Sequence, residues 1–134
     1  MKKQKAVVFE GEYIPARQTD GAACWDLRVA EDVTLPASGV AKVGLGVRMK
    51  MPKSWAGLLF IRSGWAAKGL CLANGAGVID SDYRGELSAL VHNAAGTPVH
   101  IENGTRLVQI MFIKPKGTRR RSYVVHVSEL PLKT

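Results

Sequence analysis

The segment GVIDSDYRGE, residues 77–86, brings together three carboxylates, one tyrosine and two glycines. Asp80 follows two apolar residues, so we expect its side chain to be half-buried. Partial burial keeps a carboxylate basic enough to take a proton from water. Tyr83 offers a flat ring that can pack on a sugar and exclude a 2′-hydroxyl group. The segment therefore predicts either a water-activating site beside a sugar or a polar turn with a half-buried tyrosine.

Three further polar clusters interrupt apolar segments. Asp26 stands between a tryptophan and a leucine, and Gln109 lies within the apolar run 107–112. A buried amide such as this one needs hydrogen-bond partners. The tripeptide 62–64, Arg-Ser-Gly, interrupts another apolar segment, and its glycine lets the backbone approach an anion closely. The structural alternatives are a solvent-facing strand residue, a satisfied core glutamine and a simple turn.

The segment before Asp80 carries turn residues. Asn74, Gly75 and Gly77 suit a tight hairpin turn. Such a hairpin presents backbone amides and one side-chain amide, which are the groups that recognise the edge of a base. We therefore expect a base-binding hairpin at this position.

Short strands must position these clusters. Val43, Leu45 and Val47 alternate with other residues, which is a period of two. Glycine, proline, asparagine or aspartate punctuates nearly every gap, and the weak helical segment 63–70 is bounded by glycines. We expect strands at 5–9, 25–30, 32–36, 39–52, 55–61, 69–74, 77–80, 85–93, 99–104, 105–113 and 123–130. The pattern predicts an all-β sandwich, jelly roll or barrel, as one domain over residues 1–134.

Charge and cysteine content bound the partners. The 134 residues carry a net charge of +8, much of it within 1–5 and 114–123, which favours anionic ligands or a solvated surface. Cys24 and Cys71 lie in apolar segments, and we expect them to be buried free thiols in a reducing compartment. No apolar run approaches the length of a membrane span, and the run at 6–9 is too short for a signal peptide. We expect a cytoplasmic protein with no membrane partner.

The clusters resemble, in order, four motifs of the trimeric dUTPase family. GAACWDLR, RSGWAAKGL, NGAGVIDSDYRGE and GTRLVQIMF carry the resemblance, which runs from about residue 21 to 112. It implies a β-jelly roll homotrimer with active sites between the chains. It also implies Mg²⁺-dependent hydrolysis of dUTP to dUMP and pyrophosphate. This reaction limits uracil incorporation into DNA and supplies dUMP for dTMP synthesis.

The resemblance also implies a role for each matching residue. Asp80 would activate the water that attacks the α-phosphorus, and Tyr83 would pack on the deoxyribose. Asp26 would contact Mg²⁺ through water. The residues implied for the phosphates are Arg62, Ser63, Gly64 and Gln109. Those implied for uracil are Asn74, Gly77, Val78 and Ile79.

One family feature is absent from residues 1–134. The glycine-rich fifth motif, which closes over the nucleotide, has no counterpart in these residues. Either the sequence is cut short or the protein lacks a lid, and a site without a lid should catalyse more slowly. The arginines at 119–121 are a hypothetical substitute for its arginine. Three other functions compete: a weakly catalytic or non-catalytic nucleotide-binding regulator, a related dCTP deaminase, and a nucleic-acid-binding β-barrel. Sparse aromatic residues disfavour the last, so nucleic acid is not expected as a specific partner.

Overall fold

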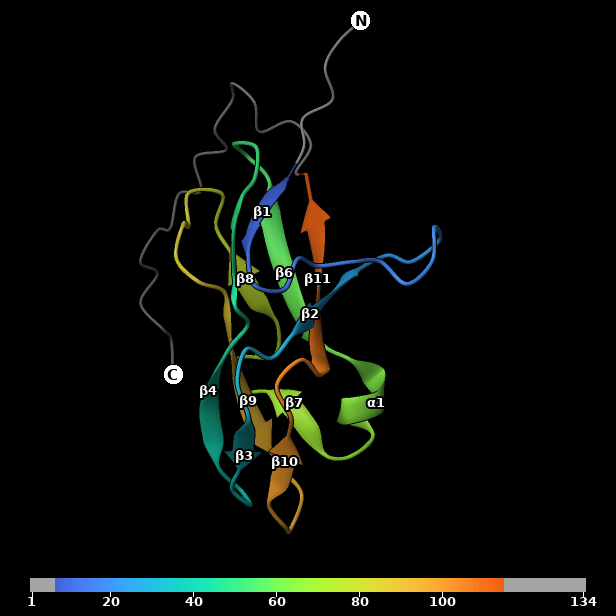
Figure 1. Cartoon of the computed structure of the whole chain (residues 1–134), viewed down its shortest axis with the longest axis vertical. Coiled ribbons are helices and arrows are strands. Elements are labelled where there is room, and N and C mark those ends of the chain that lie inside the picture. Colours follow the sequence, from blue (N-terminus) through green and yellow to red (C-terminus); the bar gives the residue numbers. More distant parts are fainter. Residues whose placement is uncertain (1–6, 115–134) are drawn as a thin grey trace, which may run out of the picture.

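The computed structural model describes residues 7–114, which form eleven strands and one short helix (Figure 1). The strands are β1 (Val8–Gly11), β2 (Trp25–Arg28), β3 (Val33–Leu35), β4 (Val40–Gly44), β5 (Val47–Lys50), β6 (Ala56–Ile61), β7 (Leu70–Leu72), β8 (Gly77–Ile79), β9 (Ser88–Asn93), β10 (Val99–Ile101) and β11 (Arg106–Ile113). The helix α1 (Ser63–Ala66) lies between β6 and β7. The all-β expectation and the one short helix near residue 63 are confirmed. The strand predicted at 123–130 and the arginines at 119–121 lie outside the described residues.

All strand pairs within the described range are antiparallel. A four-stranded sheet has the order β2-β11-β6-β8, and a three-stranded sheet has the order β4-β9-β7. Two further pairs, β1-β5 and β10-β3, lie toward opposite ends of the elongated chain (Figure 1). Strands that are neighbours in space are mostly distant in sequence, so the strand order depends on long-range contacts.

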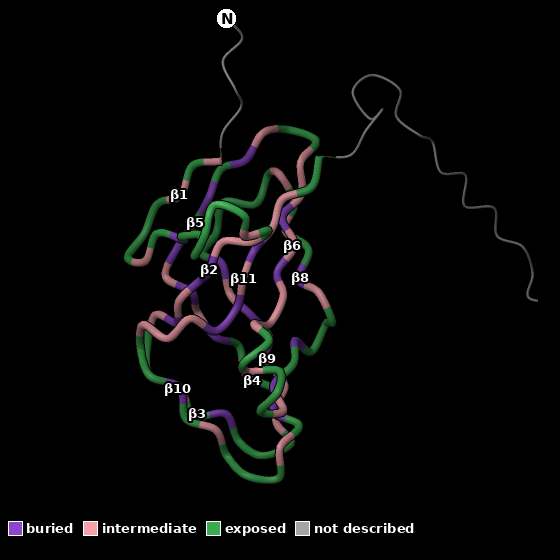
Figure 2. The backbone as a smooth tube through the Cα atoms, turned by 90° about the vertical axis from the view of Figure 1, so that its right-hand side faces the viewer, coloured by how far each residue is buried: buried purple, intermediate pink, exposed green. Residues whose placement is uncertain are grey.

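One apolar core joins the four sheets. Every sheet contributes fully buried side chains, for example Leu27 from β2, Leu35 from β3, Val43 from β4 and Val47 from β5. Buried segments run through the middle of the chain, whereas the turns are exposed (Figure 2). Burying one such aliphatic side chain contributes roughly 1.5–3 kcal/mol. The strands that form this core hold the polar clusters in position.

The segment 39–52 forms two strands instead of the one expected. Gly46 has φ of +65°, a left-handed conformation that glycine adopts without strain. The chain therefore changes direction there, and β4 pairs with β9 while β5 pairs with β1. Val43, Leu45 and Val47 are nevertheless all buried, as their alternation predicted.

A buried asparagine stabilises the junction between β9 and β3. This role was not predicted from the sequence. Asn93 is completely buried at the end of β9. Its Nδ2 donates to the carbonyls of Leu35 at 3.2 Å and Thr97 at 2.9 Å. Its Oδ1 accepts from the amide of Ala95 at 2.9 Å. Because the amide is satisfied at both ends, it stabilises the junction between β9, β3 and the following turn.

Candidate active site

Three of the predicted residues meet at one end of the four-stranded sheet. Gln109 of β11 lies directly opposite Asp26 of β2 in the antiparallel register, so both side chains point to the same face. Arg62 follows the last residue of β6, and its Nε lies 3.1 Å from Asp26 Oδ1. The structure thus brings the first, second and fourth motif segments together within one chain.

The carboxylate of Asp26 is buried but only half satisfied. The residue is 8% exposed, and its Oδ1 pairs with Arg62, which is more exposed. Its Oδ2 has no hydrogen-bond partner among residues 7–114. A buried acceptor without a partner is costly. The unpaired oxygen is therefore available to a donor that binds with a ligand, such as a metal-bound water.

The tripeptide that follows β6 lines a pocket of about 270 Å³. The lining residues are Arg62, Ser63, Gly64, Trp65 and Lys68. Gly64 has neither a positive φ nor a close neighbour, since a Cβ there would meet no heavy atom within 4 Å. Neither backbone conformation nor packing within this chain explains the glycine. The position is therefore open to a ligand or a second chain.

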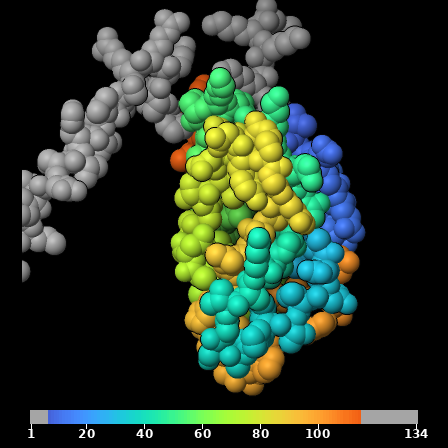
Figure 3. Space-filling view, turned by 90° about the vertical axis from the view of Figure 1, so that its left-hand side faces the viewer, coloured from blue at the N-terminus to red at the C-terminus, as the bar shows by residue number. Residues whose placement is uncertain are grey.

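The segment after β8 holds Tyr83 in one position. The amide of Tyr83 donates to the carbonyl of Asp80 at 3.1 Å, and its hydroxyl donates to the carbonyl of Glu86 at 2.9 Å. A Cβ on Gly85 would lie 2.7 Å from the tyrosine hydroxyl, so only glycine leaves room for the ring. Figure 3 shows this segment, in yellow, on the outer surface of the chain. The ring is 43% exposed and can contact a ligand.

The segment with Asp80 is far from the pocket of Arg62. In the antiparallel pairing of β6 with β8, Ile79 lies opposite Gly57, so Asp80 is level with the start of β6. Arg62 follows the other end of the same strand. At ~3.3 Å per strand residue the two lie about 20 Å apart along the strand. In Figure 1 the segment after β8 and α1 accordingly lie on opposite sides of the chain.

The sequence and the fold match one known family. A sequence model described as dUTPase matches residues 12–127. The chain belongs to the dUTPase family. The deoxyuridine 5′-triphosphate nucleotidohydrolase of Desulfitobacterium hafniense is 39% identical over 104 residues, covering 75% of this chain and 69% of the relative. The nucleotidohydrolase of Paramecium bursaria Chlorella virus 1 is 40% identical over 105 residues, covering 78% and 73%.

Solved dUTPase structures share the fold. The dUTPase from Streptococcus mutans superimposes with a TM-score of 0.75 at 35% identity, over 79% of this chain and 94% of that one. The EIAV dUTPase superimposes with a TM-score of 0.76 at 21% identity, over 90% and 98%. The expected dUTPase-like β-jelly roll is therefore confirmed.

The turn at Asn74 exists, but the predicted hairpin is wrong. The amide of Gly75 donates to the carbonyl of Leu72 at 3.0 Å, and the φ of Gly75 is +75°. The flanking strands do not pair with each other, because β7 pairs with β9 and β8 pairs with β6. The turn therefore carries the chain from one sheet to another. The side chain of Asn74 is exposed beside it.

The three predicted uracil-binding residues of β8 face different surroundings. Gly77 is buried, and a Cβ there would lie 3.1 Å from Leu59, so the glycine lets β8 pack closely on β6. Ile79 packs against the core, whereas Val78 is 64% exposed on the opposite face. Side chains in this strand cannot all contact one ligand, since they alternate between its two faces.

Two burial predictions are wrong for this chain. Asp80 is exposed, because Val78 and Ile79 belong to a sheet-edge strand with one uncovered face. Gln109 is half-buried instead of fully enclosed, because it lies on that same uncovered face of the four-stranded sheet. The apolar neighbours of both residues belong to the core-facing side of their strands.

The expectation of buried thiols is also wrong. Cys71 is exposed, with its Sγ 3.7 Å from His92 Nδ1, and Cys24 is half-buried. Both cysteines are free. Burial raises the pKa of the Cys24 thiol, and the negative charge of Asp26 adds to the effect. The neutral form of the Cys24 thiol is therefore favoured.

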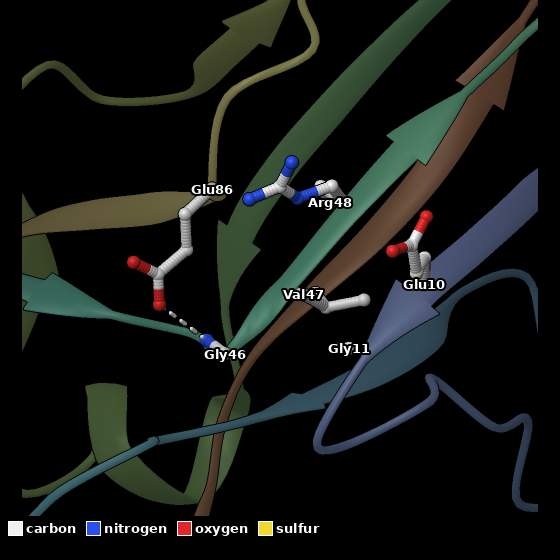
Figure 4. A pocket seen from close by; sticks show the side chains of 6 residues that line it. All are labelled: Glu10, Gly11, Gly46, Val47, Arg48 and Glu86. Atoms are coloured by element: carbon white, nitrogen blue, oxygen red, sulfur yellow. Dashed lines mark hydrogen bonds between the residues drawn. The ribbon is translucent and has the colours of Figure 1, made fainter.

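A second pocket lies beside the Tyr83 segment. It measures about 350 Å³ and is lined by Glu10, Gly11, Gly46, Val47, Arg48 and Glu86 (Figure 4). Glu86 Oε1 accepts a hydrogen bond of 2.9 Å from the amide of Gly46. The contact anchors the end of the Tyr83 segment to the junction of β4 and β5. Glu86, one of the three acids of the segment 77–86, therefore has a structural role.

Within residues 7–114, no group of three or more His, Cys, Asp or Glu side chains could hold a metal ion. In the same range no helix is long and apolar enough to cross a bilayer.

Proposed function

We propose that the chain hydrolyses dUTP to dUMP and pyrophosphate at a site shared by two copies of itself. The carrying observation is the separation of Asp80 from Arg62 by about 20 Å along β6. A water-activating carboxylate and its phosphate ligands must lie within a few ångströms of one substrate. The acidic end of one chain therefore meets the cationic end of a neighbour. In the cytoplasm this reaction limits uracil incorporation into DNA and supplies dUMP for dTMP synthesis.

Asp80 is the catalytic base in this proposal. Its carboxylate accepts a proton from a water molecule as the water oxygen bonds to the α-phosphorus. The bond from that phosphorus to the bridging oxygen breaks, and its electron pair leaves with pyrophosphate. Arg62, Ser63, Gly64 and Gln109 of the neighbouring chain bind the leaving group and stabilise its charge.

The nucleoside is selected by the other end of the site. Tyr83 packs on the deoxyribose: the bond from its hydroxyl to the carbonyl of Glu86 fixes the ring, and the residue is exposed to a ligand. A ring in this position clashes with a 2′-hydroxyl group. The turn at Asn74 and the backbone of Gly77, Val78 and Ile79 bind uracil. A close-fitting backbone leaves no room for the methyl group of thymine and mismatches the edge of cytosine.

Magnesium fits the donor set that the chain provides. The unpaired, buried Oδ2 of Asp26 is an acceptor that a metal-bound water satisfies. Because the described residues offer no multi-ligand metal cluster, the remaining ligands are triphosphate oxygens. When bound, the ion neutralises charge that develops on the phosphates.

The proposed assembly is a homotrimer. One face of the four-stranded sheet carries apolar side chains that are only partly buried in the single chain. Leu58 lies opposite both Met111 and Val78 in the strand register, so these three side chains share that face. Phe60 and Ile113 extend it. Neighbouring copies cover this face and bring the separated halves of the site together.

Pyrophosphate release tests the proposal. The purified chain is incubated with dUTP, dTTP, dCTP or UTP, each with Mg²⁺ or with a chelator, and its mass is measured by sedimentation. We expect a trimer that cleaves only dUTP, and only with Mg²⁺. Tight binding of dUTP without hydrolysis favours the non-catalytic regulator instead. Ammonia release from dCTP favours the deaminase.

A further inference from the structure

Trp65 lies between Arg62 and Lys68, the two cations that line the pocket after β6. We call this pocket the phosphate pocket. Its Nε1 donates to the carbonyl of Arg106 at 3.1 Å. The same carbonyl accepts a longer bond of 3.4 Å from Arg62 Nη1. The Nζ of Lys68 lies 4.6 Å from the centroid of the Trp65 ring, within the range of a cation–π contact. One half-buried indole thus contacts the ammonium directly and shares an acceptor with the guanidinium.

The ammonium group of Lys68 is placed to bind an anionic ligand. It is exposed and lines the same pocket as Arg62. The one ion pair among residues 7–114 joins Asp26 and Arg62, so Lys68 has no acidic partner in that range. Arg62 is already paired with Asp26, so Lys68 adds a positive charge to the pocket that no acidic side chain in this range compensates. A bound anion compensates it, and the pocket is therefore suited to an anionic group.

We propose that Lys68 binds the pyrophosphate portion of the nucleotide and that Trp65 positions it. The proposal rests on the function proposed above and adds a substrate ligand outside the residues assigned there. The indole ring restricts the flexible lysine side chain to the pocket, which lowers the entropy lost on binding. Trp65 is a positioning residue, because it acts on the phosphates through its cationic neighbours.

Binding measurements on Lys68 variants test the proposal. The probes are the non-hydrolysable α,β-imido analogue of dUTP, dUMP and inorganic tripolyphosphate, measured by calorimetry on the assembled protein. We expect Lys68→Ala to weaken binding of the imido analogue and tripolyphosphate by about 10- to 100-fold, because a charge-assisted hydrogen bond is lost. Binding of dUMP stays unchanged. Lys68→Arg keeps the charge and restores most of the affinity.

Lys42→Ala is the matched control, since it removes one exposed positive charge from β4, on the other sheet. It leaves all three affinities unchanged if the effect at Lys68 is local. Kinetics give an independent readout: Lys68→Ala raises KM for dUTP more than it lowers kcat. Trp65→Phe keeps an aromatic face for Lys68 but loses the bond to Arg106, whereas Trp65→Leu loses both. We expect the loss of affinity to be larger for Trp65→Leu.

Two outcomes overturn the proposal. One is unchanged affinity of Lys68→Ala for the imido analogue. The other is an equal loss for dUMP, which would place the lysine away from the pyrophosphate portion. Failure of the proposed function looks different, because the unmodified chain then releases no pyrophosphate from dUTP. If such a chain still bound tripolyphosphate in a Lys68-dependent manner, the polyphosphate site would stand without dUTP hydrolysis.

Discussion

Arg62 Nε lies 3.1 Å from Asp26 Oδ1, and this ion pair ties the end of β6 to the middle of β2. The pair orients the guanidinium toward the phosphate pocket while it leaves Asp26 Oδ2 without a partner. In the proposed mechanism this one contact prepares two functions, phosphate binding by the arginine and metal-water binding by the carboxylate.

Asp26→Asn tests the second of these functions. The amide retains the size of the side chain but removes its charge, so we expect a higher Mg²⁺ concentration for half-maximal activity. Because Arg62 is 35% exposed and remains hydrated, the loss of stability is only about 1 kcal/mol. A magnesium titration of pyrophosphate release measures the effect. Asp20→Asn, at an exposed position, is the control, and an unchanged titration in Asp26→Asn would refute the assignment.

Asp80→Asn tests the catalytic base. An amide cannot accept the proton of the attacking water, so we expect kcat to fall by about 10³-fold or more while KM changes little. Asp82→Asn alters a neighbouring exposed carboxylate and serves as the control. Stopped or radiolabelled assays of dUMP formation measure both variants. Similar activity in the two variants would remove Asp80 from the mechanism.

Mixed assemblies test whether each site is shared. Asp80→Asn and Arg62→Ala are each nearly inactive alone. If the two residues act in different chains, unfolding and refolding an equal mixture creates about one site in four with both residues intact. We expect activity to reappear in the mixture. Sites that are complete within single chains would give no recovery.

Two glycines distinguish a functional from a conformational requirement. Gly64→Ala meets no steric barrier within the chain, so we expect an unchanged thermal midpoint and a raised KM for dUTP. Gly75→Ala forces alanine into φ of +75° and should destabilise the protein by about 1 kcal/mol. Thermal unfolding and steady-state kinetics on both variants check this. Equal destabilisation by the two substitutions would contradict the structure.

Cys24 should show the pH dependence of a thiol whose pKa is raised. The raised pKa of Cys24 means that its neutral thiol is favoured in the folded protein. That contribution to stability is present below the ordinary thiol pKa and is lost as the pH rises through the folded value. At pH 8 we expect an aromatic disulfide to react faster with Cys24→Ser, which retains Cys71, than with Cys71→Ser. The reaction rate of Cys71→Ser, which retains Cys24, should keep rising above pH 9.0, the ordinary pKa of a thiol.

Asp26→Asn supplies a check on the cause of that shift. Part of the raised pKa of Cys24 comes from the negative charge of Asp26, so its removal should speed the reaction of Cys24 at pH 8. The Asp26→Asn/Cys71→Ser double variant isolates this thiol. A reaction rate unaffected by the charge change would leave burial as the sole cause.

Local patterns sufficed for the core and for the motif segments. Alternation at Val43, Leu45 and Val47 identified buried residues correctly, because side-chain direction in a strand is fixed by the backbone. The polar interruptions at Asp26 and Gln109 were also informative. These two polar residues, each within an apolar segment, are direct neighbours across β2 and β11.

The remaining expectations depended on which strands pair. Local patterns do not reveal those pairs, because they form between segments that are distant in the sequence. The turn chemistry at Gly75 is local and was recognisable, but the partners of β7 and β8 lie elsewhere in the sequence. The exposure of Asp80 depends on the same pairing, because only the sheet order places β8 at an edge. The shared acceptor of Trp65 and Arg62 had no sequence signal, since it is a backbone carbonyl.

The placement of acid and cation at opposite ends of β6 has a consequence for the cell. Under the proposed shared site, a newly synthesised chain can fold its jelly roll completely and still be inert toward nucleotide, because neither half of the site works alone. The rate of dUTP hydrolysis would then rise more than proportionally with the concentration of the chain. Below a threshold expression level, dUTP in the nucleotide pool would not be hydrolysed.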